Sequence, residues 1–176
     1  MRILFSNGTQ LPFERMTNIF LKMAAMLENA EIYYQAGKGA YDIEVSSSCR
    51  DRNKIHVFDF CPEDKYEALL KQSDIVVTHA GMGNVINLLA MQVDFVMFPR
   101  LVKYGEHRNN HQLDSAVAIF KKFDIPYFTE ENELVEYISN SGNVRKLKND
   151  FSDLIKSNRK LMGDGLNSLI YGESRY

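Results

Sequence analysis

Residues 74–99, DIVVTHAGMGNVINLLAMQVDFVMFP, decide the fold of this chain. Two apolar runs rich in β-branched and aromatic residues, DIVVTH (74–79) and VDFVMFP (93–99), have the length and composition of buried strands. Between them, a glycine turn leads into NVINLLAMQ (84–92), whose apolar residues recur at helical spacing. A strand, a helix and a second strand in such close succession predict a βαβ unit with parallel strands.

The same alternation of strand and helix continues on both sides of this unit. Further strands are predicted at the segments RILFS (2–6), EIYYQAG (31–37), KIHVFDF (54–60) and IPYF (125–128). Helices are predicted where apolar residues recur every three or four positions, at 13–27, 62–72, 107–123 and 129–139. Thr129 is expected to cap the last helix, and residues 38–53 are expected to form a polar connection without a period. The chain is therefore predicted to be an α/β protein with a doubly wound parallel sheet and helices on both faces.

Composition and charge narrow the class of protein. With 176 residues, 45% of them apolar and 25% charged, the chain is expected to fold as one globular domain over residues 1–142. Residues 143–176 are expected to add a helical extension packed on that domain. A net charge of -2 argues against nucleic acid as a partner.

Targeting and metal-binding signals are missing from the sequence. The first residues lack the pattern of a secretory signal, and no apolar run approaches the roughly 20 residues of a transmembrane helix, so a cytoplasmic location is expected. Cys49 and Cys61 lie far apart, without a CxxC motif, and are expected to be free thiols rather than metal ligands.

Ligands bind at the carboxyl ends of the strands in an open parallel sheet, so the loops after the strands hold the candidate residues. The turn after the first strand can present backbone N–H groups to an anion, with the candidates Asn7, Gly8 and Thr9. The turn after residue 78 brings a backbone with two glycines to the start of a helix, where a diphosphate fits. Its candidates are His79, Ala80, Gly81, Gly83 and Asn84. Tight turns without a ligand, and a structural role for the histidine, remain the alternatives.

The third loop, residues 100–112, is the densest in polar side chains. It contains Arg100, Glu106, Asn110, His111 and Gln112 just before an apolar helix. Amides and carboxylates can bind sugar hydroxyls, and the guanidinium can offer its charge to phosphate. A polar, capped helix start is the structural alternative.

Four segments in order, NGTQLPFERM (7–16), QAG (35–37), DIVVTHAGMGN (74–84) and FPRLVKYGEHRNNHQLDSA (98–116), resemble the catalytic half of split GT-B glycosyltransferases. The resemblance spans roughly residues 1–140, and family members include bacterial capsule and exopolysaccharide transferases and a dolichol-pathway GlcNAc transferase. It implies a Rossmann-like domain equivalent to the C-terminal domain of a GT-B enzyme, of the family 28 type. It also implies a UDP-sugar donor and inversion at the anomeric carbon, with no metal ion and no cofactor.

The resemblance also implies roles for individual residues. The turn from His79 to Asn84 would hold the diphosphate, with Asn7, Gly8, Thr9 and Arg100 also binding the donor. His111 and Gln112 would lie against the donor sugar, with Glu106 and Asn110 nearby; the candidate catalytic residues are His111, Gln112 and Glu106. Relatives commonly have an acidic residue for the ribose hydroxyls where this chain has Asn87, a weaker partner that is still a donor-binding candidate.

The function that these features predict is half of a two-component enzyme. The chain would be the donor-binding catalytic subunit of an inverting transferase that moves a hexose from a UDP-sugar to a lipid-linked saccharide in capsule or exopolysaccharide synthesis. Its expected partner is a membrane-anchored, acceptor-binding subunit that brings it to the inner face of the membrane. The alternative is a non-catalytic subunit that binds nucleotide sugar or stabilises its partner. An epimerase of the UDP-GlcNAc type would need a second Rossmann domain, for which 176 residues are too few.

Overall fold

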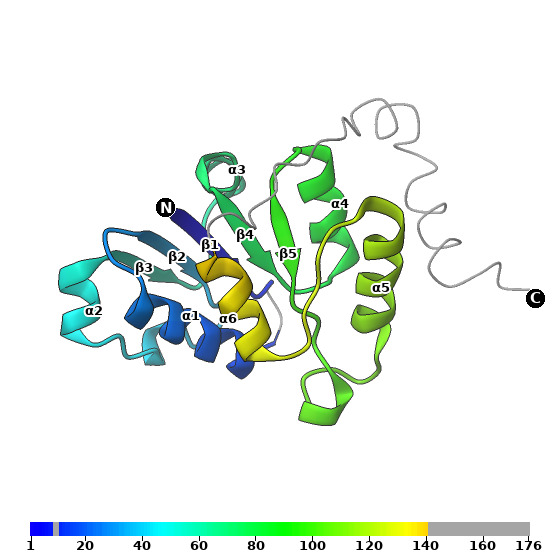
Figure 1. Cartoon of the computed structure of the whole chain (residues 1–176), viewed down its shortest axis with the longest axis horizontal. Helices are drawn as coiled ribbons and strands as arrows, with labels where there is room; N and C mark the ends of the chain where they lie inside the picture. Colours follow the sequence, from blue (N-terminus) through cyan, green and yellow to red (C-terminus); the bar gives the residue numbers. More distant parts are fainter. Residues whose placement is uncertain (9–10, 141–176) are drawn as a thin grey trace, which may run out of the picture.

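Five parallel strands form the sheet of the computed structural model, which describes residues 1–8 and 11–140 (Figure 1). The strands are β1 (Arg2–Ser6), β2 (Glu31–Gln35), β3 (Lys54–Phe58), β4 (Ile75–Thr78) and β5 (Phe95–Met97). Their spatial order is β3-β2-β1-β4-β5. Ile3 of β1 is in register with Ile32 of β2 and with Ile75 of β4, so β1 is the central strand.

Helices cover both faces of this sheet. They are α1 (Glu14–Met26), α2 (Ser47–Arg52), α3 (Glu63–Gln72), α4 (Met82–Ala90), α5 (His111–Phe123) and α6 (Glu131–Ser139), with two 3-10 turns, η1 (Ala40–Asp42) and η2 (Val102–Tyr104). Successive strand residues point to opposite faces, so Ile3 and Phe5 pack with α1, α2 and α6, whereas Leu4 packs with α3, α4 and α5. Figure 1 shows α1 and α6 lying together in front of the sheet.

The apolar period of α1 explains its position. Met16, Ile19, Phe20 and Met23 recur at helical spacing, and all four side chains are fully buried. The helix ends at Met26, and Asn29 then takes a left-handed backbone with φ of 56° before β2 begins. This arrangement brings the start of α1 to the carboxyl edge of the sheet, beside the loops that carry the candidate residues.

The predicted α/β class is confirmed, and every predicted helix within the described residues is present. Two predicted segments differ from the structure. The connection 38–53 contains the helix α2, which Ser46 starts by accepting a hydrogen bond from the Cys49 backbone N–H at 3.4 Å. Such a short, capped helix needs no apolar period. IPYF (125–128) makes only an isolated bridge from Tyr127 to Met97, because Pro126 has no N–H to donate.

Three helix starts also differ from the sequence prediction. α4 begins at Met82 rather than near Asn84, and α5 begins at His111 rather than at residue 107. The residue that precedes α6 is Glu130, and neither it nor Thr129 caps the helix with a side-chain hydrogen bond. The predicted helical extension, 143–176, lies outside the described residues.

Candidate functional site

A polar cavity lies beside the sheet at the point where the strand order reverses. The chain runs outward from β1 through β2 to β3 and then returns to the other side of β1 as β4. Loops that follow β1 and β4 therefore diverge and leave a crevice at the carboxyl edge of the sheet, the usual ligand position in open α/β folds. A cavity of about 600 Å³ occupies this position.

Three separate loops bring their predicted residues to this cavity. The candidates that line it are Asn7, Gly8, His79, Gly83, Asn84, Asn87, Arg100 and Gln112. The cavity also has lining residues that the sequence did not single out: Ser6, Leu11, Gln35, Phe60, Cys61, Glu63, Tyr66 and His107. Ser6 and Gln35 end β1 and β2, whereas Glu63 and Tyr66 stand on α3, for which the sequence pattern indicated only an apolar face.

The other candidates lie outside the cavity lining. Ala80 is buried, and Gly81 lies behind His79. Asn110 precedes α5 and accepts a hydrogen bond from the Val102 backbone N–H at 3.3 Å. Thr9 lies outside the described residues.

Two of the three candidate catalytic residues also have other surroundings than expected. The side chain of His111 is 55% exposed and lies 4.0 Å from the Asp114 carboxylate. Both carboxylate oxygens of Glu106 accept hydrogen bonds from Arg15, at 2.7 and 2.6 Å. Catalytic roles for His111 and Glu106 stay predictions, and this geometry favours only Gln112 as a residue that faces a ligand.

The imidazole of His79 lies against two glycines. A Cβ atom at Gly8 would stand 2.6 Å from the His79 Cε1 atom, and a Cβ atom at Gly81 would collide with Nε2. Gly8 also has φ of +72°, a conformation that L side chains rarely adopt. Gly81 is one of the two glycines that suggested a close backbone approach to a ligand, and together with Gly8 it makes room for this ring.

His79 is uncharged at neutral pH. Burial, together with the nearby positive charge of Arg100, lowers the pKa of His79 from 6.5 to about 4. Its Nδ1 atom is buried and has no hydrogen-bond partner among the described residues. A neutral imidazole still has one N–H donor and one acceptor. His79 is therefore suited to hydrogen bonding, and its low pKa makes it a weak base.

We expect protonation of His79 to destabilise the fold at acidic pH. The unfolded chain binds this proton near pH 6.5, but the folded chain resists it until about pH 4. The stabilisation by the neutral imidazole is complete above pH 6.5. As the pH falls from 6.5 to about 4, the free energy of unfolding decreases by roughly 3 kcal/mol in total. Urea unfolding of the wild type and of His79→Gln between pH 4 and 8 measures this loss of stability. The variant should show a weaker pH dependence, and parallel curves would contradict the prediction.

Arg100 brings a buried positive charge to the cavity. The residue is 3% exposed, and its guanidinium donates to the main-chain carbonyls of Asn7 (3.1 Å), Leu11 (2.6 Å) and Pro12 (2.5 Å). No carboxylate of the described residues forms an ion pair with it. These hydrogen bonds hold the loop after β1, and the expected role of Arg100, to offer its charge to phosphate, stays a prediction. Its charge remains unpaired beside the cavity.

Hydrogen bonds order the polar floor of the cavity. Ser6 Oγ donates to Gln35 Oε1 at 2.9 Å and lies 2.8 Å from the Tyr66 hydroxyl. Asn7, 3% exposed, donates from Nδ2 to the Tyr34 hydroxyl at 2.7 Å, which fixes the amide orientation. Its Oδ1 atom is buried and has no partner among the described residues. This unpartnered oxygen is an exception to the rule that buried polar atoms form hydrogen bonds, and it lies in a residue that lines the cavity.

The chain matches a known family in sequence and known structures in fold. A family model, the glycosyltransferase family 28 C-terminal domain, matches residues 2–156. The chain is similar in fold to MurG of Acinetobacter baumannii, with 15% identity, a TM-score of 0.65, and coverage of 97% of this chain and 52% of that one. It is also similar to the glycotransferase of kitacinnamycin, with 19% identity, a TM-score of 0.56, and coverage of 96% and 43%. The chain thus spans about half the length of these proteins. No curated protein matches its sequence.

Proposed function

The chain belongs to the glycosyltransferase family 28 C-terminal domain family, and from this premise we propose that it is the donor-binding catalytic subunit of a two-component inverting glycosyltransferase. It would move a hexose from a UDP-sugar to a lipid-linked saccharide in capsule or exopolysaccharide synthesis. The observation that carries the proposal is the cavity between β1 and β4, where an unpaired guanidinium and a neutral imidazole lie beside the start of a helix.

The start of α4 is suited to a diphosphate. The first backbone bond of this helix runs from the Val85 N–H to the Gly81 carbonyl, so the N–H groups of residues 82–84 precede the hydrogen-bonded turns. Gly83 lines the cavity with open space around its Cα. N–H groups at a helix start attract anions, and the charge of Arg100 adds to that attraction. We place the diphosphate here.

The nucleoside has room on the side of the cavity formed by α3. Phe60 is 48% exposed at the rim, and an aromatic ring in this position can stack on a base. Tyr66 and Glu63 of α3 also line the cavity. Asn87 offers an amide where relatives commonly have a carboxylate, and Glu63 is the only carboxylate among the described lining residues. We propose that Glu63 and Asn87 share the ribose hydroxyls.

Calorimetric titration of the purified chain tests the proposed function. We expect UDP to bind, UMP to bind more weakly because it lacks the second phosphate, and one of UDP-glucose, UDP-galactose, UDP-GlcNAc and UDP-glucuronate to bind best. Absence of binding by UDP and by all four donors would contradict the proposal. Donor binding without turnover, even beside the partner subunit, would instead favour the alternative of a non-catalytic nucleotide-sugar-binding subunit.

Gln112 is the residue that we expect to contact the donor sugar. Its Oε1 atom accepts from the Arg100 backbone N–H at 3.0 Å, which turns the amide so that its nitrogen is free to donate to a ligand in the cavity. Gln112→Ala should lower turnover of the donor about tenfold to a hundredfold but change UDP affinity little, because the lost contact is to the sugar. His111→Ala is the matched neighbour and should have the smaller effect. Equal losses of turnover and UDP affinity in Gln112→Ala would contradict the assignment.

Membrane association belongs to the proposed partner. Among the described residues, no helix is long and apolar enough to cross a membrane. We propose that a membrane-anchored subunit holds the lipid-linked acceptor and brings this chain to the inner face of the membrane. The cavity is partly open to solvent, which leaves room for a second protein surface to face it.

A further inference from the structure

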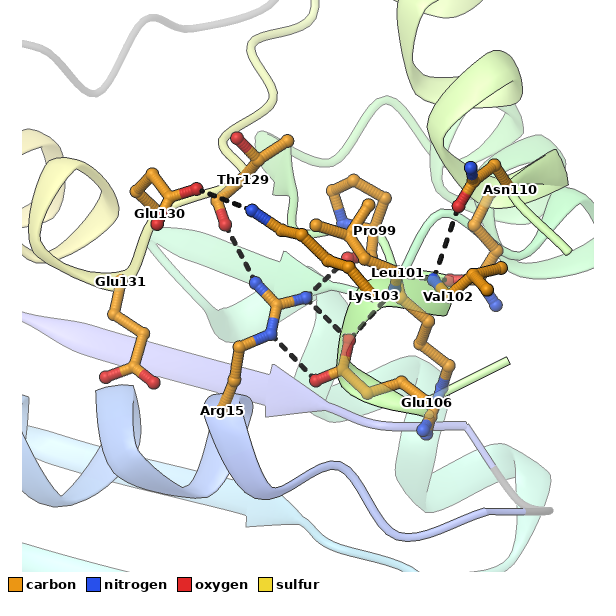
Figure 2. Close-up of polar contacts among 12 residues, drawn as sticks. Arg15, Pro99, Leu101, Val102, Lys103, Glu106, Asn110, Thr129, Glu130 and Glu131 are labelled. Atoms are coloured by element: carbon orange, nitrogen blue, oxygen red, sulfur yellow. Dashed lines mark hydrogen bonds and ion pairs between the residues drawn. The ribbon is translucent and has the colours of Figure 1, made fainter. Parts of the chain in front are cut away.

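Arg15 is a buried cation that joins three separate segments of the chain. It stands in the first turn of α1, is 8% exposed, and donates to both oxygens of Glu106 (Figure 2). The same guanidinium donates to the carbonyls of Pro99 at 3.0 Å and Thr129 at 2.8 Å. One side chain therefore connects α1 with the segment after β5 and with the segment before α6.

Glu106 extends this connection along the loop between β5 and α5, residues 99–110, which we call the β5–α5 loop. Besides its ion pair with Arg15, its Oε2 atom accepts from the Leu101 backbone N–H at 2.9 Å. Figure 2 shows two more contacts that hold the loop: Val102 N–H to Asn110, and Lys103 to Glu130 at 3.2 Å. The carboxylate thus closes the loop on itself and attaches it to α1.

A column of aromatic rings links Arg15 to Arg100. The Arg15 guanidinium lies between Phe98 and Tyr104, 4.4 Å from each ring centroid. Phe98 stacks on Phe13 with centroids 5.6 Å apart, and the Arg100 guanidinium lies 4.4 Å from the Phe13 centroid. Arg15 is not among the residues that line the cavity, whereas Arg100 is. The contacts of the first arginine therefore fix the surroundings of the second.

We propose that Arg15 and Glu106 are positioning residues for donor binding, a proposal that rests on the proposed function. They hold the β5–α5 loop in the shape that sets Arg100 and Gln112 against the cavity. The guanidinium fork and the carboxylate match in a bidentate geometry, which fixes direction as well as distance. Glu106 acts through the loop, and neither residue touches the ligand.

The proposal is tested with four variants and a matched control. Arg15→Met removes the ion pair and Arg15→Lys keeps the charge without the fork. Glu106→Gln keeps an acceptor for Leu101. Arg15→Met/Glu106→Leu removes both charges together, which avoids leaving a buried charge unpaired. The control is Arg2→Met, which removes another arginine–glutamate pair, with Glu31, at the opposite end of β1.

Two measurements are made on each folded variant. Hydrogen exchange follows the backbone amides of residues 101–110, and calorimetry compares UDP with the UDP-sugar that binds the wild type best. In Arg15→Met and in the double variant, we expect faster hydrogen exchange in the β5–α5 loop. We also expect the affinity for the UDP-sugar to fall about tenfold more than the affinity for UDP. Arg15→Lys and Glu106→Gln should lie between these and the wild type, and Arg2→Met should change neither quantity.

The outcomes separate this proposal from the proposed function. Unchanged loop exchange in the double variant would overturn the positioning role. Faster exchange with equal losses for UDP and UDP-sugar would also overturn it, because the residues would then be merely structural. If the wild type bound neither UDP nor any UDP-sugar, the proposed function would fail first, whereas the exchange result would still report whether the two residues hold the loop.

Discussion

Gly81→Val is expected to abolish measurable UDP binding, with a loss of at least about a hundredfold in affinity. A Cβ atom at this position would collide with Nε2 of His79 and stand 2.9 Å from Cδ2. The ring has little room to retreat, because Gly8 lies against its Cε1 atom. The imidazole or the start of α4 must then move, and both border the proposed diphosphate position. Calorimetry with UDP, on protein whose fold is checked by circular dichroism, measures the loss.

Gly83→Ala separates folding from binding in the same helix. A Cβ atom at Gly83 meets nothing within 4 Å, and alanine favours a helix over glycine by about 1 kcal/mol. Thermal stability should therefore rise while UDP affinity falls, since the new methyl group enters the space beside the helix start.

A folded Gly81→Val protein that binds UDP like the wild type would locate the nucleotide site elsewhere.

The second large effect is expected in the transfer assay, where the chain alone should move no sugar. Transfer to an acceptor hydroxyl needs a base with a pKa near the working pH and a surface that holds the acceptor. His79 is a poor base, because its pKa is about 4, and Glu106 is engaged with Arg15. His107 lines the cavity and is one base candidate within this chain. We expect the acceptor surface and the base to come from the partner subunit.

The assay uses a labelled UDP-sugar and a lipid-linked acceptor with the purified chain, the purified membrane-anchored subunit and their mixture. Only the mixture should transfer sugar, with an increase of several orders of magnitude, since orientation alone can supply roughly 7–11 kcal/mol of the barrier. Full transfer by the 176-residue chain alone would overturn the two-component proposal. His107→Ala would then show whether that imidazole is the base.

The fold could be predicted from the sequence because its strands are short apolar runs and its helices have an apolar period. DIVVTH became β4, and the spacing of Met16, Ile19 and Phe20 gave the buried face of α1. Local hydrogen bonding was harder to predict. The short helix α2 depends on Ser46 rather than on a period, and Pro126 prevents IPYF from pairing as a strand.

The candidate site was predictable in its loops but less so in its side chains. Helix starts decide which residues face the cavity, and α5 begins four residues later than its polar sequence suggested. The shift leaves Gln112 at the cavity and His111 exposed. Tyr66 shares an apolar helical face, and a period cannot reveal that its hydroxyl reaches Ser6. No sequence signal paired Arg15 with Glu106, because 91 residues separate them.

The aromatic column that links Arg15 to Arg100 has a consequence for the speed of donor capture. Phe13 and Phe98 connect the two guanidinium groups within the free protein, so Arg100 and Gln112 already stand at the cavity before a ligand arrives. Association then needs no slow ordering of this wall. In stopped-flow mixing, the observed rate should rise linearly with UDP concentration and show no plateau from a preceding conformational step.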